Sequence, residues 1–245
     1  MIESCSYAIR VQLRSEAIFS SGEKAFGLVQ SKALTDPDGF VYFHAKSLKG
    51  QLKREAFWLL KQYMQIDQQR AASFCEHMDF LFGLNPELEL KKDKYKPLVA
   101  HLYERQEDRL NVTEGKMKLG HLELPRAVRH YYKSMLEQDE EQGYVRISSH
   151  DLTAAQTERR VGIQLEEAGS ARKKHFTSYH AVKEGLIFYA PVHFMCSPSC
   201  ECLDDLVRIV AAFRHIGASI HRGRGEVEAN LLCNDEPLGL SKGGQ

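Results

Sequence analysis

The chain has 245 residues, 43% hydrophobic and 27% charged, a globular composition that excludes a disordered or collagen-like protein. Its 33 basic and 33 acidic residues cancel, so a nucleic-acid partner has to be held by local patches and not by an overall positive field. The longest apolar run, 186–191, is far below the roughly 20 residues that span a bilayer, and the start of the chain lacks the pattern of an export signal. We expect a soluble cytoplasmic protein with no membrane partner, whose six cysteines are reduced.

The first predicted elements are a strand, a turn and a helix. Residues 7–14 alternate between apolar and polar side chains, as in a half-buried strand. The sequence Asp-Pro-Asp-Gly at 36–39 predicts a tight turn. Ser47 can cap a helix whose apolar residues then recur every three or four positions.

Three further elements follow a long, charge-dense stretch. Residues 184–194 have strand character, 203–216 form an amphipathic helix that a glycine ends, and 225–233 alternate again. One more strand inside the long stretch would complete the order βαββαβ. We therefore predict an α+β protein with a ferredoxin-like (RRM-like) core.

The predicted organisation is a single domain over 1–245. Its core comprises 1–66 and 185–235, and 67–184 form a large insertion. Residues 236–245 are expected to form a loose tail.

Two basic clusters without acidic residues stand out against the neutral total. The first reads HAKSLKGQLKR at 44–54 and opens the predicted helix, where free backbone N–H groups also favour an anion. The second reads RHIGASIHRGRG at 214–225, where glycines and arginines can form a concavity that binds phosphates. Solvated basic surfaces and a plain glycine-rich connection are the alternatives. The candidate phosphate-binding and RNA-binding residues are Lys46, Ser47, Lys49, Lys53, Arg54, Gly217, His221, Arg222, Gly223 and Arg224.

Other cofactor signals are weaker. The glycines follow a helix and precede a strand, the reverse of a dinucleotide-binding loop, and no phosphate-binding P-loop motif occurs. His193, Cys196, Cys200 and Cys202 supply four zinc-compatible donors without the paired C-x-x-C spacing of zinc knuckles. Structural zinc and ordinary thiols both remain open.

Motifs at both ends and in the middle of the chain together resemble the RAMP superfamily of CRISPR-associated proteins. They are the Ser-Gly loop at 20–22, the Asp-x-Asp-Gly-Phe turn at 36–40, Ser-Leu-Lys-Gly at 47–50, and Phe-Arg-His-Ile-Gly followed by Arg-Gly-Arg-Gly at 213–225. The segments 160–163, 169–171 and 179–185 look like a protruding thumb and its return. The thumb candidates are Arg160, Gly169, Ala171 and Arg172.

Within that superfamily the chain is similar to the backbone subunits of type III interference complexes. The resemblance implies binding of guide RNA through its sugar-phosphate backbone, recognition of complementary target RNA in antiviral defence, contact with other complex subunits, and repeated copies along the guide. Contacts to phosphates suit this task because they are independent of the spacer sequence.

A catalytic role is less well supported. Some such subunits cut target RNA with an aspartate that precedes the Asp-Gly turn, and Gln30 occupies the corresponding place here. The remaining candidates are Glu23, Asp36 and His44, with magnesium only if the chain is a nuclease. A metal-dependent target-RNA endonuclease and an unrelated ferredoxin-like interaction module therefore stay open as alternatives.

Overall fold

The computed structural model describes residues 5–24, 31–84, 114–142, 147–165 and 171–241. Its main sheet has five strands. All neighbouring strands of this sheet are antiparallel, and their spatial order is β4 (Met117–Leu119), β7 (Ile187–Phe194), β1 (Tyr7–Leu13), β8 (Val227–Cys233) and β9 (Glu236–Pro237).

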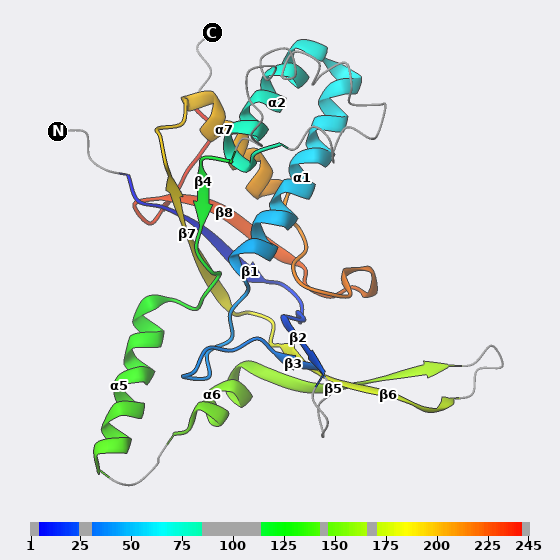
Figure 1. Cartoon of the computed structure of the whole chain (residues 1–245), viewed down its shortest axis with the longest axis vertical. Helices are drawn as coiled ribbons and strands as arrows, with labels where there is room; N and C mark the ends of the chain where they lie inside the picture. The colour runs from blue at the N-terminus through cyan, green and yellow to red at the C-terminus, as the bar shows by residue number, and fades with distance from the viewer. Residues whose placement is uncertain (1–4, 25–30, 85–113, 143–146, 166–170, 242–245) are drawn as a thin grey trace.

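Three helices pack together on one face of this sheet (Figure 1). They are α1 (Ala45–Ile66), α2 (Gln68–Phe82) and α7 (Cys200–Ala212). Read along the chain, β1, α1, β4, β7, α7 and β8 give βαββαβ, which confirms the predicted ferredoxin-like α+β fold. β4 is the further strand expected within the insertion.

The alternating sequence of β1 separates the two faces of the sheet. Ile9, Val11 and Leu13 are buried toward the helices, whereas Arg10 and Gln12 lie on the opposite face. In α1 the buried residues recur every fourth position and face the sheet, namely Leu48, Leu52, Ala56 and Leu60. This shared core and a hydrogen bond from Lys49 to Met117 of β4 fix the start of α1 against the sheet.

A second sheet carries the predicted thumb. Its strand order is β2 (Ser20–Lys24), β3 (Ser31–Ala33), β6 (Ala171–Val182) and β5 (Thr157–Leu165). β5 and β6 form a long antiparallel hairpin that extends away from the body of the molecule (Figure 1). The remaining helices in the described part of the chain are α5 (Arg126–Gln142), α6 (Ser149–Gln156) and the 3-10 turn η2 (Ile220–Arg222).

The predicted N-cap of the first helix is wrong, and two other segments are packed more closely than their sequences suggest. α1 begins at Ala45 with His44 as its N-cap, so Ser47 lies inside the helix and does not cap it. α2 lies in the predicted insertion, yet Phe74 and Met78 are fully buried in the common core. The tail is held as far as residue 241, because β9 pairs with β8 and the backbone N–H of Ser241 donates to Asp204.

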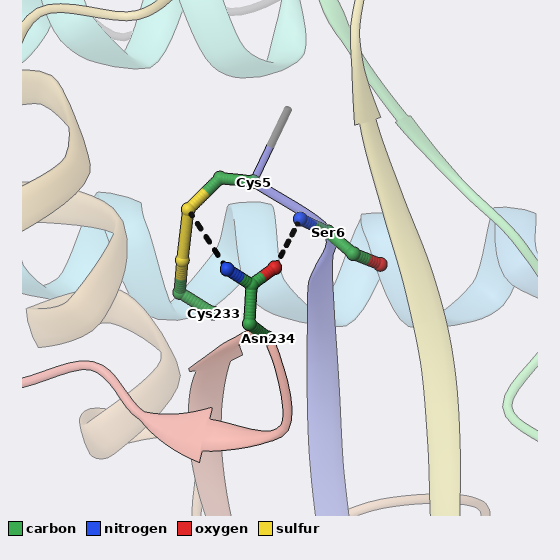
Figure 2. The surroundings of a disulfide bond; sticks show 4 residues. All are labelled: Cys5, Ser6, Cys233 and Asn234. Atoms are coloured by element: carbon green, nitrogen blue, oxygen red, sulfur yellow. Dashed lines mark hydrogen bonds between the residues drawn. A yellow bond between two sulfur atoms is a disulfide. The ribbon is translucent and has the colours of Figure 1, made fainter. Parts of the chain in front are cut away.

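A disulfide joins Cys5 to Cys233, so the prediction that all six cysteines are reduced is wrong for this pair (Figure 2). Asn234 supports the link, since its side-chain oxygen accepts a hydrogen bond of 2.9 Å from the Ser6 N–H. The bond therefore ties the start of β1 to the end of the adjacent β8. None of the helices in the described part of the chain has the length and hydrophobicity of a membrane span.

Candidate nucleic-acid interface

The lysines of the first basic cluster divide into two groups. The Lys49 ammonium donates to the Met117 carbonyl at 2.8 Å, and the Lys53 ammonium donates to the Gly83 carbonyl at 2.8 Å. Burial, and the neighbouring charge of Lys118, lower the pKa of Lys49. These two lysines therefore attach α1 to neighbouring segments, while Lys46 remains exposed.

The glycine loop after α7 has a conformation that depends on its glycines. Gly217 and Gly225 adopt φ of +84° and +70°, and a Cβ on Gly225 would lie 1.9 Å from the Ile216 carbonyl oxygen. Gly223 also has a positive φ, +71°, but no atom lies within 4 Å of its Cβ position. The loop therefore closes tightly at its two ends and leaves η2 outside, with His221 and Arg222 exposed.

The start of α1 and the glycine loop adjoin. The Gln51 side-chain nitrogen donates to the Gly217 carbonyl at 3.4 Å, which places the loop beside the second turn of α1. Gly50 is exposed within this turn, and nothing lies within 4 Å of its Cβ position. We call the exposed surface on both sides of this junction the α1–loop face; it consists of Ser47, Gly50, Arg54, His221, Arg222 and Gly223.

Arg224 connects the glycine loop to the base of the thumb. Its Nε donates to Glu16 at 2.9 Å, and Arg160 of β5 donates to the other oxygen of Glu16 at 2.8 Å. The Arg224 guanidinium lies over the Tyr179 ring, 4.8 Å from its centre, and Tyr179 pairs with Arg160 across the hairpin. Burial alone would raise the pKa of Glu16, but the hydrogen bonds from the two arginines lower it. Glu16 thus fixes both guanidinium groups at one place.

The other thumb candidates lie farther along the hairpin. Ala171 and Arg172 begin β6, on the strand that returns toward the core. Gly169 lies outside the described residues. Of the four candidates, the structure thus brings Arg160 into contact with the glycine-loop network.

The catalytic candidates have structural roles where they are described. Asp36 accepts a 2.9 Å hydrogen bond from the Phe40 N–H in the predicted turn and lies 3.6 Å from Arg129. The His44 Nδ1 accepts from the Lys46 N–H at 3.2 Å as the cap of α1. Glu23 lies in β2, and Gln30 lies outside the described residues. These contacts favour a turn role for Asp36 and a helix-cap role for His44.

The four zinc-compatible residues do not converge. In the described part of the chain, no three His, Cys, Asp or Glu side chains are close enough together to hold a metal ion. His193, Cys196 and Cys200 are exposed, whereas Cys202 is buried on the inner side of α7, and burial raises the pKa of its thiol to about 12. A neutral buried thiol is a poor zinc ligand.

Sequence reasoning missed Glu16, Gln51 and Tyr179. Glu16 follows a strand in a segment with no periodic pattern, and its arginine partners are 144 and 208 residues away. Gln51 stands inside the first basic cluster, but its role depends on a backbone carbonyl of the distant loop. The pairing of Arg160 with Tyr179 depends on the register of the hairpin, which neither strand shows by itself.

Comparison with known proteins places this fold. No family model matches the chain, and no curated protein matches it. A chain of the type III-B Cmr-beta structure in its apo state is 12% identical, covers 94% of this chain and 98% of its own length, and has a TM-score of 0.58. A chain of Cmr-beta bound to cognate target RNA is 11% identical over 92% and 96%, with a TM-score of 0.59.

A type IV-B CRISPR complex contains a further similar chain. It is 13% identical, covers 98% of this chain and 95% of its own length, and has a TM-score of 0.52. At sequence identities this low, the structural similarity establishes a shared fold and nothing further. This chain therefore shares, over almost its whole length, the fold of chains found in CRISPR complexes.

Proposed function

We propose that the chain is a guide-RNA-binding backbone subunit of a type III CRISPR ribonucleoprotein that recognises target RNA in antiviral defence. The observation that carries the proposal is the α1–loop face, where two basic segments distant in sequence adjoin and leave Arg54 and Arg222 exposed. The fold shared with chains of CRISPR complexes supports it.

In this proposal the α1–loop face contacts the sugar-phosphate backbone of the guide. Backbone contacts hold any spacer sequence, and the complementary target is then selected by base pairing. Arg160, fixed by Glu16 at the base of the hairpin, aligns the thumb with this face, and the thumb separates bases of the guide–target duplex. Other subunits of the complex, and further copies of this chain along the guide, are its protein partners.

Reversal of the two exposed charges tests the proposal. Arg54→Glu and Arg222→Glu should each weaken binding of two unrelated single-stranded RNAs by about tenfold and reduce the salt dependence of binding, because each removes a phosphate contact. Fluorescence anisotropy titrations at two salt concentrations measure both effects. Lys61→Glu, the same change on the same helix two turns farther from the loop, is the matched control. A loss confined to one RNA sequence, or equal in the control, would contradict the proposal.

Gly50 gives a second test, in which stability and binding should move in opposite directions. Glycine in a helix interior is about 1 kcal/mol less favourable than alanine, and an added methyl group at Gly50 meets no atom of the protein. Gly50→Ala should therefore raise the melting temperature by about 2–4 °C. It should also weaken RNA binding, because the methyl group blocks close approach of the RNA backbone. A more stable variant with unchanged RNA affinity would show that RNA does not pass over Gly50.

A further inference from the structure

A groove of about 1120 Å³ lies on the face of the main sheet opposite α1, α2 and α7. Its floor includes Arg10 of β1, flanked in register by Tyr189 of β7 on one side and Asn230 of β8 on the other. One wall is α5, which Figure 1 shows well apart from the other long helices. The proposed guide-binding surface uses none of these residues.

The α5 wall of the groove is basic, although the acidic residues Asp38, Glu123 and Asp235 also line the groove. Arg126, Arg129, His130 and Lys133 all line it, and their spacing of three and four residues places them on one side of α5. A helix that flanks a sheet ordinarily turns an apolar stripe toward it, but here the basic side lines the groove. This orientation favours an anionic occupant.

The charged residues of α5 are distributed in the opposite way to the one that the helix dipole favours. Its first turn contains no acidic residue and its last turn contains no basic one, and the acidic residues follow the basic ones in the closing sequence EQDEEQ. Basic side chains near a helix N-terminus destabilise the helix, because they lie at the positive end of the dipole. The arrangement does, however, concentrate positive potential where α5 meets the groove.

The basic side chains of α5 differ in whether an acidic residue of the chain lies beside them. Lys133 lies 3.4 Å from Asp38, and Arg129 is paired with Glu123. Arg126 and His130 form no ion pair with any described residue, and both are exposed. The Arg10 guanidinium donates to the neutral Gln12 amide at 3.2 Å, and its nearest acidic influence is Glu228, whose pKa it helps to lower.

We infer that this groove binds a segment of single-stranded RNA, at a site separate from the α1–loop face. The row formed by Tyr189, Arg10 and Asn230 offers an aromatic ring, a planar cation and an amide side by side, and these groups stack on nucleobases and form hydrogen bonds with their edges. Arg126 and His130 face the phosphates from the wall. An acidic peptide would use the cations but not the aromatic ring, so the observations favour RNA.

The test uses a fluorescently labelled ten-nucleotide oligouridine RNA with the full chain. The double variant Arg126→Glu/His130→Glu and the single variant Tyr189→Leu should each lower its affinity by about tenfold. The same losses should appear in a protein that already carries Arg54→Glu and Arg222→Glu, because the groove acts independently of the α1–loop face. Melting temperatures establish that each variant is folded, and Tyr189→Phe, which keeps the ring, should bind like the wild type.

Two results would overturn the inference. One is unchanged RNA affinity in both groove variants. The other is equal competition by a ten-residue glutamate peptide, which would show a general anion site. If the groove variants lose RNA while Arg54→Glu/Arg222→Glu binds normally, the groove inference stands and the proposed guide-binding surface fails, so the two proposals are separable.

Discussion

Asp205→Asn should lower the free energy of unfolding by about 3–5 kcal/mol, the usual cost of breaking a buried ion pair by removing one partner. The Asp205 side chain is fully buried and accepts hydrogen bonds from Arg70, from His77 at 2.6 Å and from Arg208 at 2.9 Å. An amide in its place has no charge and turns a donor toward these donors. Urea denaturation at pH 7 measures the loss.

The effect should depend on pH in a defined direction. Burial alone would raise the pKa of Asp205, but hydrogen bonds from His77 and Arg70 and the Arg70 charge lower it. A lowered folded-state pKa stabilises the protein above the ordinary aspartate value of about 4, and this stabilisation is lost as the pH falls through the folded-state pKa. The difference between wild type and variant should therefore shrink in acid.

Asp204→Asn is the matched control for Asp205→Asn. Asp204 is the adjacent residue, but its carboxylate bonds to Ser241 near the end of the chain and not to the buried cluster. This control should change stability by less than about 1 kcal/mol. Equal losses in the two variants would mean that the Asp205 cluster contributes nothing specific.

Gly225→Ala should destabilise the protein by on the order of 3 kcal/mol and weaken RNA binding with it. A left-handed conformation costs a non-glycine residue about 1–2 kcal/mol, and the added Cβ would also lie 1.9 Å from the Ile216 carbonyl. The backbone must then shift. Because the Gly225 N–H donates to the Glu16 carbonyl at 2.8 Å, this shift would also displace Glu16, whose carboxylate fixes Arg160 and Arg224. Thermal unfolding and RNA titration report the two effects.

Gly223→Ala separates strain from collision. Gly223 has almost the same φ as Gly225, but its Cβ position meets no atom within 4 Å. Its substitution should therefore cost only about 1 kcal/mol and leave the Glu16 network in place. If the two alanine variants are equally destabilised, the contact with Ile216 does not matter and the loop relaxes around it.

The core of the fold could be predicted from the sequence because its elements have strong periodic patterns. Strict alternation identified β1, and β7, α7 and β8 follow the predicted order within a few residues. β4 has only three residues, too few to show a period, so only the completion of the topology required it. Nothing in the local sequence of α2 indicated that it joins the core.

The site was less predictable, because composition locates charges but not their partners. Lys49 and Arg222 look alike in the sequence, yet Lys49 bonds to the backbone of β4 and Arg222 is exposed. Which basic side chain is exposed depends on tertiary contacts such as those to Met117 and Gly83. The pairing of Glu16 with arginines from two distant segments depends on the folded chain in the same way.

The disulfide between Cys5 and Cys233 also determines how the protein responds to pulling. β1 and β8 are antiparallel neighbours, with Tyr7 opposite Cys233, so tension applied to the two chain ends would unzip their hydrogen bonds one pair after another. The covalent bond lies ahead of the first of these pairs and encloses the residues between the two cysteines in a ring. Once β9 has been pulled from β8, tension from one terminus to the other therefore passes through sulfur and bypasses the pairing of β1 with β8. With both ends of the chain tethered, the oxidised core would bear no load.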